Sequence, residues 1–207
     1  MFRHLAELVV SGPPSGALRP ASFRDRRQFR PAADALGGAP SHQSFDGPSW
    51  IAVYRVAHSR RDLFGNQVGL SERDTVAAAE VNGRVIFGTN SDALTYSSSD
   101  RVSAQRYVDV LVEKYPKTMS VENIGGIPNN SLYHAESTIL LRAARDNGGT
   151  LAGRTLEIHV DRPVCWSCDV ALPMLGLELG NPTITLVEPG GAARTMRNGD
   201  WLDQVRP

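Results

Sequence analysis

The sequence is poor in cysteine, in lysine and in long apolar runs. Its two cysteines, Cys165 and Cys168, are too few for the disulfide framework that staples small secreted domains. Apart from Lys114 and Lys117, arginine supplies the strongly basic side chains. No apolar run approaches the roughly 20 residues of a transmembrane helix. The apolar stretch of the opening segment is too short for a signal peptide. We therefore expect no membrane partner and a chain that folds in the cytoplasm.

Charge and composition divide the chain into two parts. The formal net charge is zero and 41% of the residues are apolar, so a sizeable core is expected but no global field that attracts nucleic acid. We predict a Pro/Gly/Arg-rich extension over residues 1–49 and a folded domain over residues 50–207. Five arginines of the extension surround Phe23 and Phe29, namely Arg19, Arg24, Arg26, Arg27 and Arg30. Such a segment is typical of a solvated arm, and it also suits a phosphate backbone with stacked bases.

Hydrophobic periodicity predicts helices interleaved with strands. A strand is expected over residues 50–56 from its β-branched and aromatic content, and a hairpin over 75–90 that turns at Asn82 and Gly83. Further elements are predicted by period and by end signals: helices over 97–115, 133–149 and 165–179, and strands over 154–160, 183–189 and 192–197. This order indicates a layered α/β domain. The last two strands leave no room for a crossover, so we expect them to pair antiparallel.

The two cysteines admit more than one chemistry. A structural zinc site needs four protein ligands, which this chain does not offer at any usual spacing. A thiol redox pair fits better, because the CxxC segment follows a strand and opens a helix, whose N-terminus lowers a thiol pKa.

A third interpretation of the two cysteines adds the segment His-Ala-Glu at residues 134–136. Cys165 and Cys168 share one helix face, and His134 can supply a third ligand from the start of another helix. Three protein ligands with an open fourth position are typical of catalytic zinc. Glu136 stands two residues beyond His134, where it can carry protons without binding the metal. This is the H-x-E…C-x-x-C order of the zinc-dependent nucleobase deaminases.

The stretch from Thr75 to about Glu188 resembles the cytidine deaminase superfamily. Its segments "HAESTILLRAARDNGG", "LEIHVDRPVCWSC" and "ITLVEPGG" are similar to those of the deaminase toxins of bacterial polymorphic toxin systems. The resemblance implies a three-layer α/β/α domain with a mixed sheet and an antiparallel C-terminal hairpin. It also implies an immunity protein as a partner and secretion or delivery into a target cell.

Carried over by position, the resemblance implies zinc bound by His134, Cys165 and Cys168, with Glu136 as the general acid/base. The backbone N–H of Ala135 would then meet the pyrimidine carbonyl.

Three further positions are candidates for substrate contact. Asn90 matches an asparagine that contacts the sugar, although an asparagine that closes a turn is an equal interpretation. Val164 stands where the superfamily usually has proline. The resemblance implies that the carbonyl at this position accepts a hydrogen bond from the leaving amino group, and valine still offers that carbonyl. Trp166 can stack on a base or form part of the core.

These features predict a zinc-dependent deaminase that converts cytosine to uracil in DNA, single- or double-stranded, in preference to RNA. A deaminase of free cytidine or its nucleotide is the alternative within the same chemistry, since Asp92 follows Asn90 where such enzymes hold the ribose. A CxxC redox protein and a non-catalytic zinc-stabilised binding module are the alternatives from other classes.

Overall fold

The computed structural model describes residues 45–123 and 128–202. Its N-terminal part holds α1 (Gly47–His58) and a small hairpin of β1 (Ser59–Arg61) and β2 (Gln67–Gly69). The middle part holds β3 (Val76–Val81), β4 (Arg84–Thr89), α2 (Ser98–Lys114) and two short 3-10 helices, η1 (Val121–Asn123) and η2 (Asn129–Tyr133). The remainder comprises α3 (Ala135–Asp146), β5 (Thr155–Val160), α4 (Trp166–Glu178), β6 (Thr183–Val187), β7 (Ala193–Arg197) and β8 (Asp200–Trp201).

The main sheet in this part of the chain has six strands in the order β4-β3-β5-β6-β7-β8. Strands β5 and β6 are parallel and are joined through α4, whereas their neighbours pair antiparallel. The predicted mixed sheet and antiparallel C-terminal hairpin, β6–β7, are therefore confirmed.

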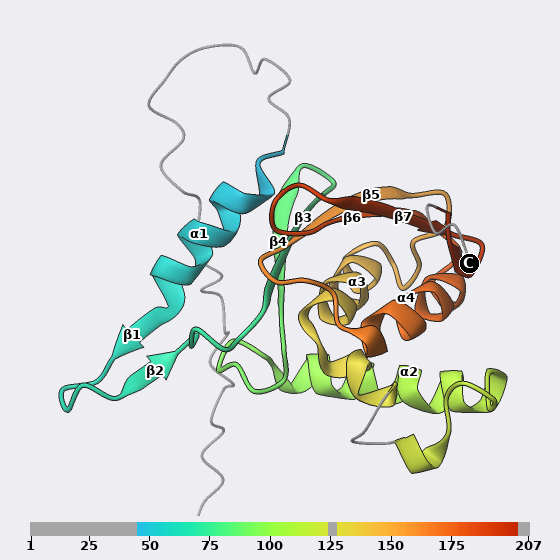
Figure 1. The fold of residues 1–207 in the computed structure, drawn as a ribbon, viewed down its shortest axis with the longest axis horizontal. Coiled ribbons are helices and arrows are strands. Elements are labelled where there is room, and N and C mark those ends of the chain that lie inside the picture. The colour runs from blue at the N-terminus through green and yellow to red at the C-terminus, as the bar shows by residue number, and fades with distance from the viewer. Residues whose placement is uncertain (1–44, 124–127, 203–207) are drawn as a thin grey trace, which may run out of the picture. The chain divides into compact units, whose positions relative to one another are not determined.

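Helices cover both faces of this sheet, so the domain has three layers, α/β/α. Alternate residues of β3 divide between them: Val76 and Ala78 pack with α1, while Ala77 and Ala79 join the larger core on the other face. That larger core is built from α3 and α4, with α2 packed outside them (Figure 1). Both helices that carry the predicted ligands thus lie on one face of the sheet.

The strand predicted over residues 50–56 is wrong, because these residues belong to α1. The β-branched and aromatic content that indicated a strand is overridden by a strong helix start. The Asp46 carboxylate accepts from the backbone N–H of Ser49 at 3.1 Å, and Pro48 lies in the first turn, where its missing N–H costs nothing. The helix then buries Ile51 against the sheet.

The other predicted elements are confirmed within one to three residues at most ends. Asn82 and Gly83 have φ of 53° and 72°, as the two central residues of a tight hairpin turn require. Helix α2 begins with a capping box, in which Ser97 and Asp100 each bond the other's backbone N–H. The short strands β1, β2 and β8 and the two 3-10 helices were not predicted.

The arginines and phenylalanines of the predicted extension lie outside the described residues. Residues 45–49, at its C-terminal end, include the N-cap and the first residues of α1. Among residues 45–123 and 128–202, the helices are all too short or too polar to cross a membrane.

A buried ion pair fixes α3 relative to α2 and β4. Arg142 donates to both carboxylate oxygens of Asp100, at 2.5 and 3.0 Å, and to the carbonyl of Phe87 at 2.7 Å. Burial by itself would raise the pKa of Asp100, but hydrogen bonds from Arg142 and Ser97 hold it well below its usual range. The pair therefore stabilises the fold while Asp100 is ionised.

We predict that Asp100→Ala lowers the free energy of unfolding by about 3–5 kcal/mol, because it leaves Arg142 charged and without its partner inside the protein. Arg145→Ala is the matched control, since Arg145 reaches the same carboxylate at 3.3 Å but its side chain is 43% exposed; we expect a loss below about 1 kcal/mol. Urea denaturation measures the free energy of unfolding of both variants.

The same ion pair makes stability depend on pH. Because the folded pKa of Asp100 is lowered, its contribution to the free energy of unfolding is full above the unfolded value of about 3.9 and is lost as the pH falls towards the folded pKa. Equal losses of unfolding free energy in Asp100→Ala and Arg145→Ala would contradict this role of the buried ion pair.

Candidate metal centre

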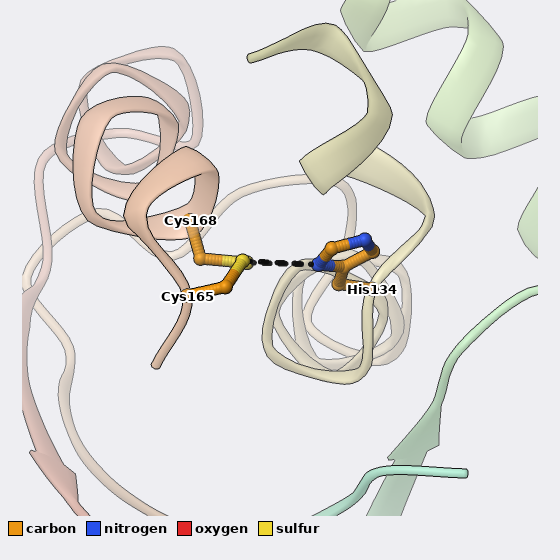
Figure 2. Close-up of side chains that lie close together, drawn as sticks. All are labelled: His134, Cys165 and Cys168. Carbon is orange, nitrogen blue, oxygen red and sulfur yellow. Dashed lines mark hydrogen bonds between the residues drawn. The ribbon is translucent and has the colours of Figure 1, made fainter. Parts of the chain in front are cut away.

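The three predicted ligands lie at the N-termini of two neighbouring helices. His134 is the N-cap residue of α3, and Cys165 is the N-cap residue of α4, with Cys168 in its first turn. Neither N-cap side chain caps a backbone N–H of its own helix, so both can face each other. Figure 2 shows the His134 ring pointing at the two sulfur atoms.

The distances within this cluster fit one metal ion. The Nδ1 atom of His134 lies 3.4 Å from the Sγ of Cys165 and 3.3 Å from the Sγ of Cys168. The three ligand atoms all lie within 4.8 Å of one another. Around tetrahedral zinc, bond lengths of about 2.0–2.1 Å to nitrogen and about 2.3 Å to sulfur place these atoms about 3.6 Å apart. The cluster is therefore already close to the geometry that a tetrahedral ion requires.

The electrostatics of the cluster favour a thiolate at Cys165. A hydrogen bond from Cys168 is the main cause that lowers the pKa of Cys165 to about 3, against the effect of burial, and His134 and Ser167 add to it. The same interaction with Cys165, together with burial, raises the pKa of Cys168. The hydrogen bond with Cys165 also raises the pKa of His134. A bound metal would displace the protons that remain on these groups, so metal binding and proton release are coupled.

Glu136 lies beside the ligands without joining them. It is the second residue of α3 and only 4% exposed. Within the described residues, the cluster of side chains able to hold a metal comprises His134, Cys165 and Cys168 but not Glu136. Burial raises the pKa of the Glu136 carboxyl, whose charge also interacts with His134. A raised carboxyl pKa suits a group that carries protons near neutral pH.

The start of α3 is brought to the sheet by a glycine in β4. A Cβ atom on Gly88 would lie 2.3 Å from the carbonyl oxygen of Ala135 and 2.8 Å from the backbone nitrogen of Ile139. Only a residue without a side chain allows this approach. Gly88 therefore sets the depth at which His134 and Glu136 enter the site.

The structure places the other candidate residues around this centre. Ala135 is buried as the first residue of α3, where a helix leaves its N–H groups without internal partners. Trp166 begins α4 and is 65% exposed. The backbone N–H of Val164 donates to the Glu188 carboxylate at 2.7 Å.

Asn90 is joined to the neighbouring loop. Its side-chain oxygen accepts from the N–H of Thr75 at 2.8 Å, and its amide donates to Asp74 at 3.3 Å. These bonds agree with its interpretation as a residue that closes a turn. The next residue, Ser91, donates to the carbonyl of Tyr133 at 2.9 Å, so this loop reaches the residue before His134.

Two positions that shape the centre were not predicted. Gly88 looked like an ordinary strand residue, although a glycine inside a strand signals the close approach of another segment. Glu188 lies near the end of the strand predicted over 183–189, and no local pattern relates it to Val164.

Comparison with protein-family models and with curated proteins finds no match for this chain. The function is therefore inferred from the site itself.

We predict that Gly88→Ala weakens metal binding at the cluster, because its methyl group would displace the start of α3 and His134 with it. Gly176→Ala is the matched control, since a Cβ there meets nothing nearer than 3.6 Å. Titration with Co²⁺, followed by visible absorption, measures the affinity of each variant. Unchanged affinity in Gly88→Ala, with the fold intact, would show that this contact does not set the site.

Proposed function

We propose that this protein is a zinc-dependent deaminase that converts cytosine to uracil in DNA. The observation that carries the proposal is the buried Glu136 carboxyl beside a His134, Cys165 and Cys168 cluster of metal-ligand geometry. A histidine and two thiolates form a ligand set that zinc prefers, and three protein ligands leave a fourth position for a water or substrate. Zinc in such a site supplies the Lewis acidity that activates water near neutral pH.

Glu136 would carry the protons of the reaction. The overall change is cytosine plus water to uracil plus ammonia, so a proton must pass from the attacking water to the leaving amino group. Burial raises the pKa of the Glu136 carboxyl, which is the direction that suits a group that both accepts and releases a proton. Its place in the first turn of α3 keeps it next to the ligands while leaving the metal position to them.

Backbone groups around the centre would orient the base. The N–H of Ala135 would donate to the pyrimidine carbonyl, and the carbonyl of Val164 would accept from the leaving amino group. Trp166 follows Cys165 in the chain and is 65% exposed, so its ring is available to stack on a base. Asn90 would contact the sugar through the hydrogen-bonding capacity of its side chain that the bonds to Thr75 and Asp74 do not use.

A nucleic acid is favoured over a free nucleoside as the carrier of the base by Trp166 and by the arginines of the N-terminal segment. Phosphate contacts normally supply most of the affinity for a nucleic acid. A chain of zero net charge must therefore concentrate its basic residues, as the sequence does between Arg19 and Arg30.

A thiol redox activity is the second candidate, and one observation favours it. Cys165 is exposed at a helix N-terminus and has a lowered pKa, as a reactive thiol requires. His134 within 3.4 Å of both sulfur atoms favours metal binding instead. Zinc content separates the two functions.

We predict that Glu136→Gln lowers the rate of uracil formation by about 10²–10⁴-fold while the zinc content and the melting temperature stay nearly unchanged. The amide keeps the shape of the carboxyl but cannot carry the proton. Uracil formation on a cytosine-containing oligonucleotide, with metal analysis of the same sample, measures both effects.

His134→Ala serves as the comparison and should lose zinc and activity together. Loss of zinc from Glu136→Gln would show that Glu136 is a ligand and not a proton carrier.

We predict that full-length protein forms uracil in DNA, and that replacing the arginines with alanine weakens this activity. The variant changes Arg19, Arg24, Arg26, Arg27 and Arg30 together. Each lost phosphate contact should reduce the slope of log affinity against log salt by about 0.9 on duplex DNA. Uracil is measured on single-stranded DNA, duplex DNA, RNA and free cytidine over a range of salt concentrations.

Any turnover of free cytidine should be unaffected by the same variant, which makes it the internal control. Efficient turnover of cytidine, with no uracil in DNA at any salt concentration, would replace this proposal with a free-nucleoside deaminase.

A further inference from the structure

The segment between β5 and α4 is held in place at Val164, the residue before Cys165. The N–H of Val164 donates to Oε1 of Glu188, at the end of β6, at 2.7 Å. The carboxylate that accepts this bond is charged, and charge-assisted hydrogen bonds are the stronger kind. One side of the Cys165–Cys168 segment is thereby fixed to the C-terminal hairpin.

The other side of the segment is fixed to the same hairpin. Arg194, in β7, donates to Oδ1 of Asp169, the residue after Cys168, at 2.5 Å. Trp201 donates from its ring to the carbonyl of Asp169 at 2.8 Å. The Arg194 guanidinium lies 4.4 Å from the centre of the Trp201 ring and 3.8 Å from the Glu188 carboxylate. The residues on both sides of the two cysteines are therefore joined through Glu188 and Arg194.

We infer that Glu188 and Arg194 are positioning residues that clamp the metal-binding segment between Val164 and Asp169 onto the β6–β7 hairpin. The clamp would also fix the direction of the Val164 carbonyl, which would accept a hydrogen bond from the leaving amino group. Only this part of the inference rests on the proposed function. For the metal ligands it rests on the geometry of the cluster.

The physical need for such a clamp follows from the position of Cys165. Cys165 precedes the first turn of α4. The backbone N–H of Val164, the residue before it, therefore has no hydrogen bond within the helix to hold it. Rotation about the backbone of Val164 would swing the Sγ of Cys165 away from His134. Cys168 lies within the helix and is buried, so it is held by packing. Glu188 supplies, for the exposed ligand, the restraint that helix packing supplies for the buried one.

The test uses full-length protein with Co²⁺ as the probe, because its visible absorption reports both affinity and ligand geometry. Groups that orient metal ligands typically contribute about 10–100-fold in metal affinity, and we expect a loss of this size in Glu188→Ala. Glu188→Gln keeps an oxygen acceptor for Val164 and should recover most of the affinity. Arg194→Ala, which releases Asp169, should lower the affinity in the same direction and decides the matter if Glu188→Ala does not fold.

Glu178→Ala is the matched control. This carboxylate lies at the far end of α4, accepts from the hydroxyl of Tyr115 at 3.0 Å and pairs with Lys114. Its loss should lower the free energy of unfolding without changing the cobalt spectrum. If Glu188→Ala and Arg194→Ala lose stability as Glu178→Ala does, with unchanged spectrum and affinity, the clamp is refuted.

The cobalt titration does not depend on deaminase activity. Absence of uracil in the wild-type protein would refute the proposed function, while weaker cobalt binding in Glu188→Ala would still support the clamp. Uracil formation in the wild type, with cobalt binding and turnover both unchanged in Glu188→Ala and Arg194→Ala, would refute the clamp alone.

Discussion

The whole site depends on the meeting of two helix N-termini at one point. The ligand atoms come from residues 31 and 34 positions apart, yet they lie within 4.8 Å of one another. This is possible because α3 and α4 lie on the same face of the sheet and begin at the same edge, on either side of β5. The parallel pair β5–β6, which requires a crossover helix, is what places α4 there.

Each of these two helices is braced by an arginine and a carboxylate. Arg142 of α3 bonds Asp100 and β4, and Arg194 of β7 bonds Asp169 of α4. Both pairs are partly or fully buried, where screening by solvent and salt is weaker than at the surface. A metal site needs its ligands held against thermal motion, and the braces supply this restraint on the two sides of the cluster separately.

Local signals in the sequence were enough for most of the fold and for the ligands. Helix caps, the Asn82-Gly83 turn and the CxxC segment each act over a few residues, so their patterns can be read without the fold. The prediction failed at residues 50–56, where aromatic and β-branched residues suggested a strand but Asp46 and Pro48 start a helix. Glu188 and Gly88 were missed because their roles depend on contacts with segments distant in the sequence, Val164 and the start of α3.

The most direct test of the account is metal analysis combined with X-ray absorption at the zinc edge, on protein purified without added metal. We expect about one zinc per chain with two sulfur ligands at about 2.3 Å and nitrogen or oxygen ligands at about 2.0–2.1 Å. Protein that contains no zinc, and in which Cys165 and Cys168 oxidise reversibly to a disulfide, would contradict it.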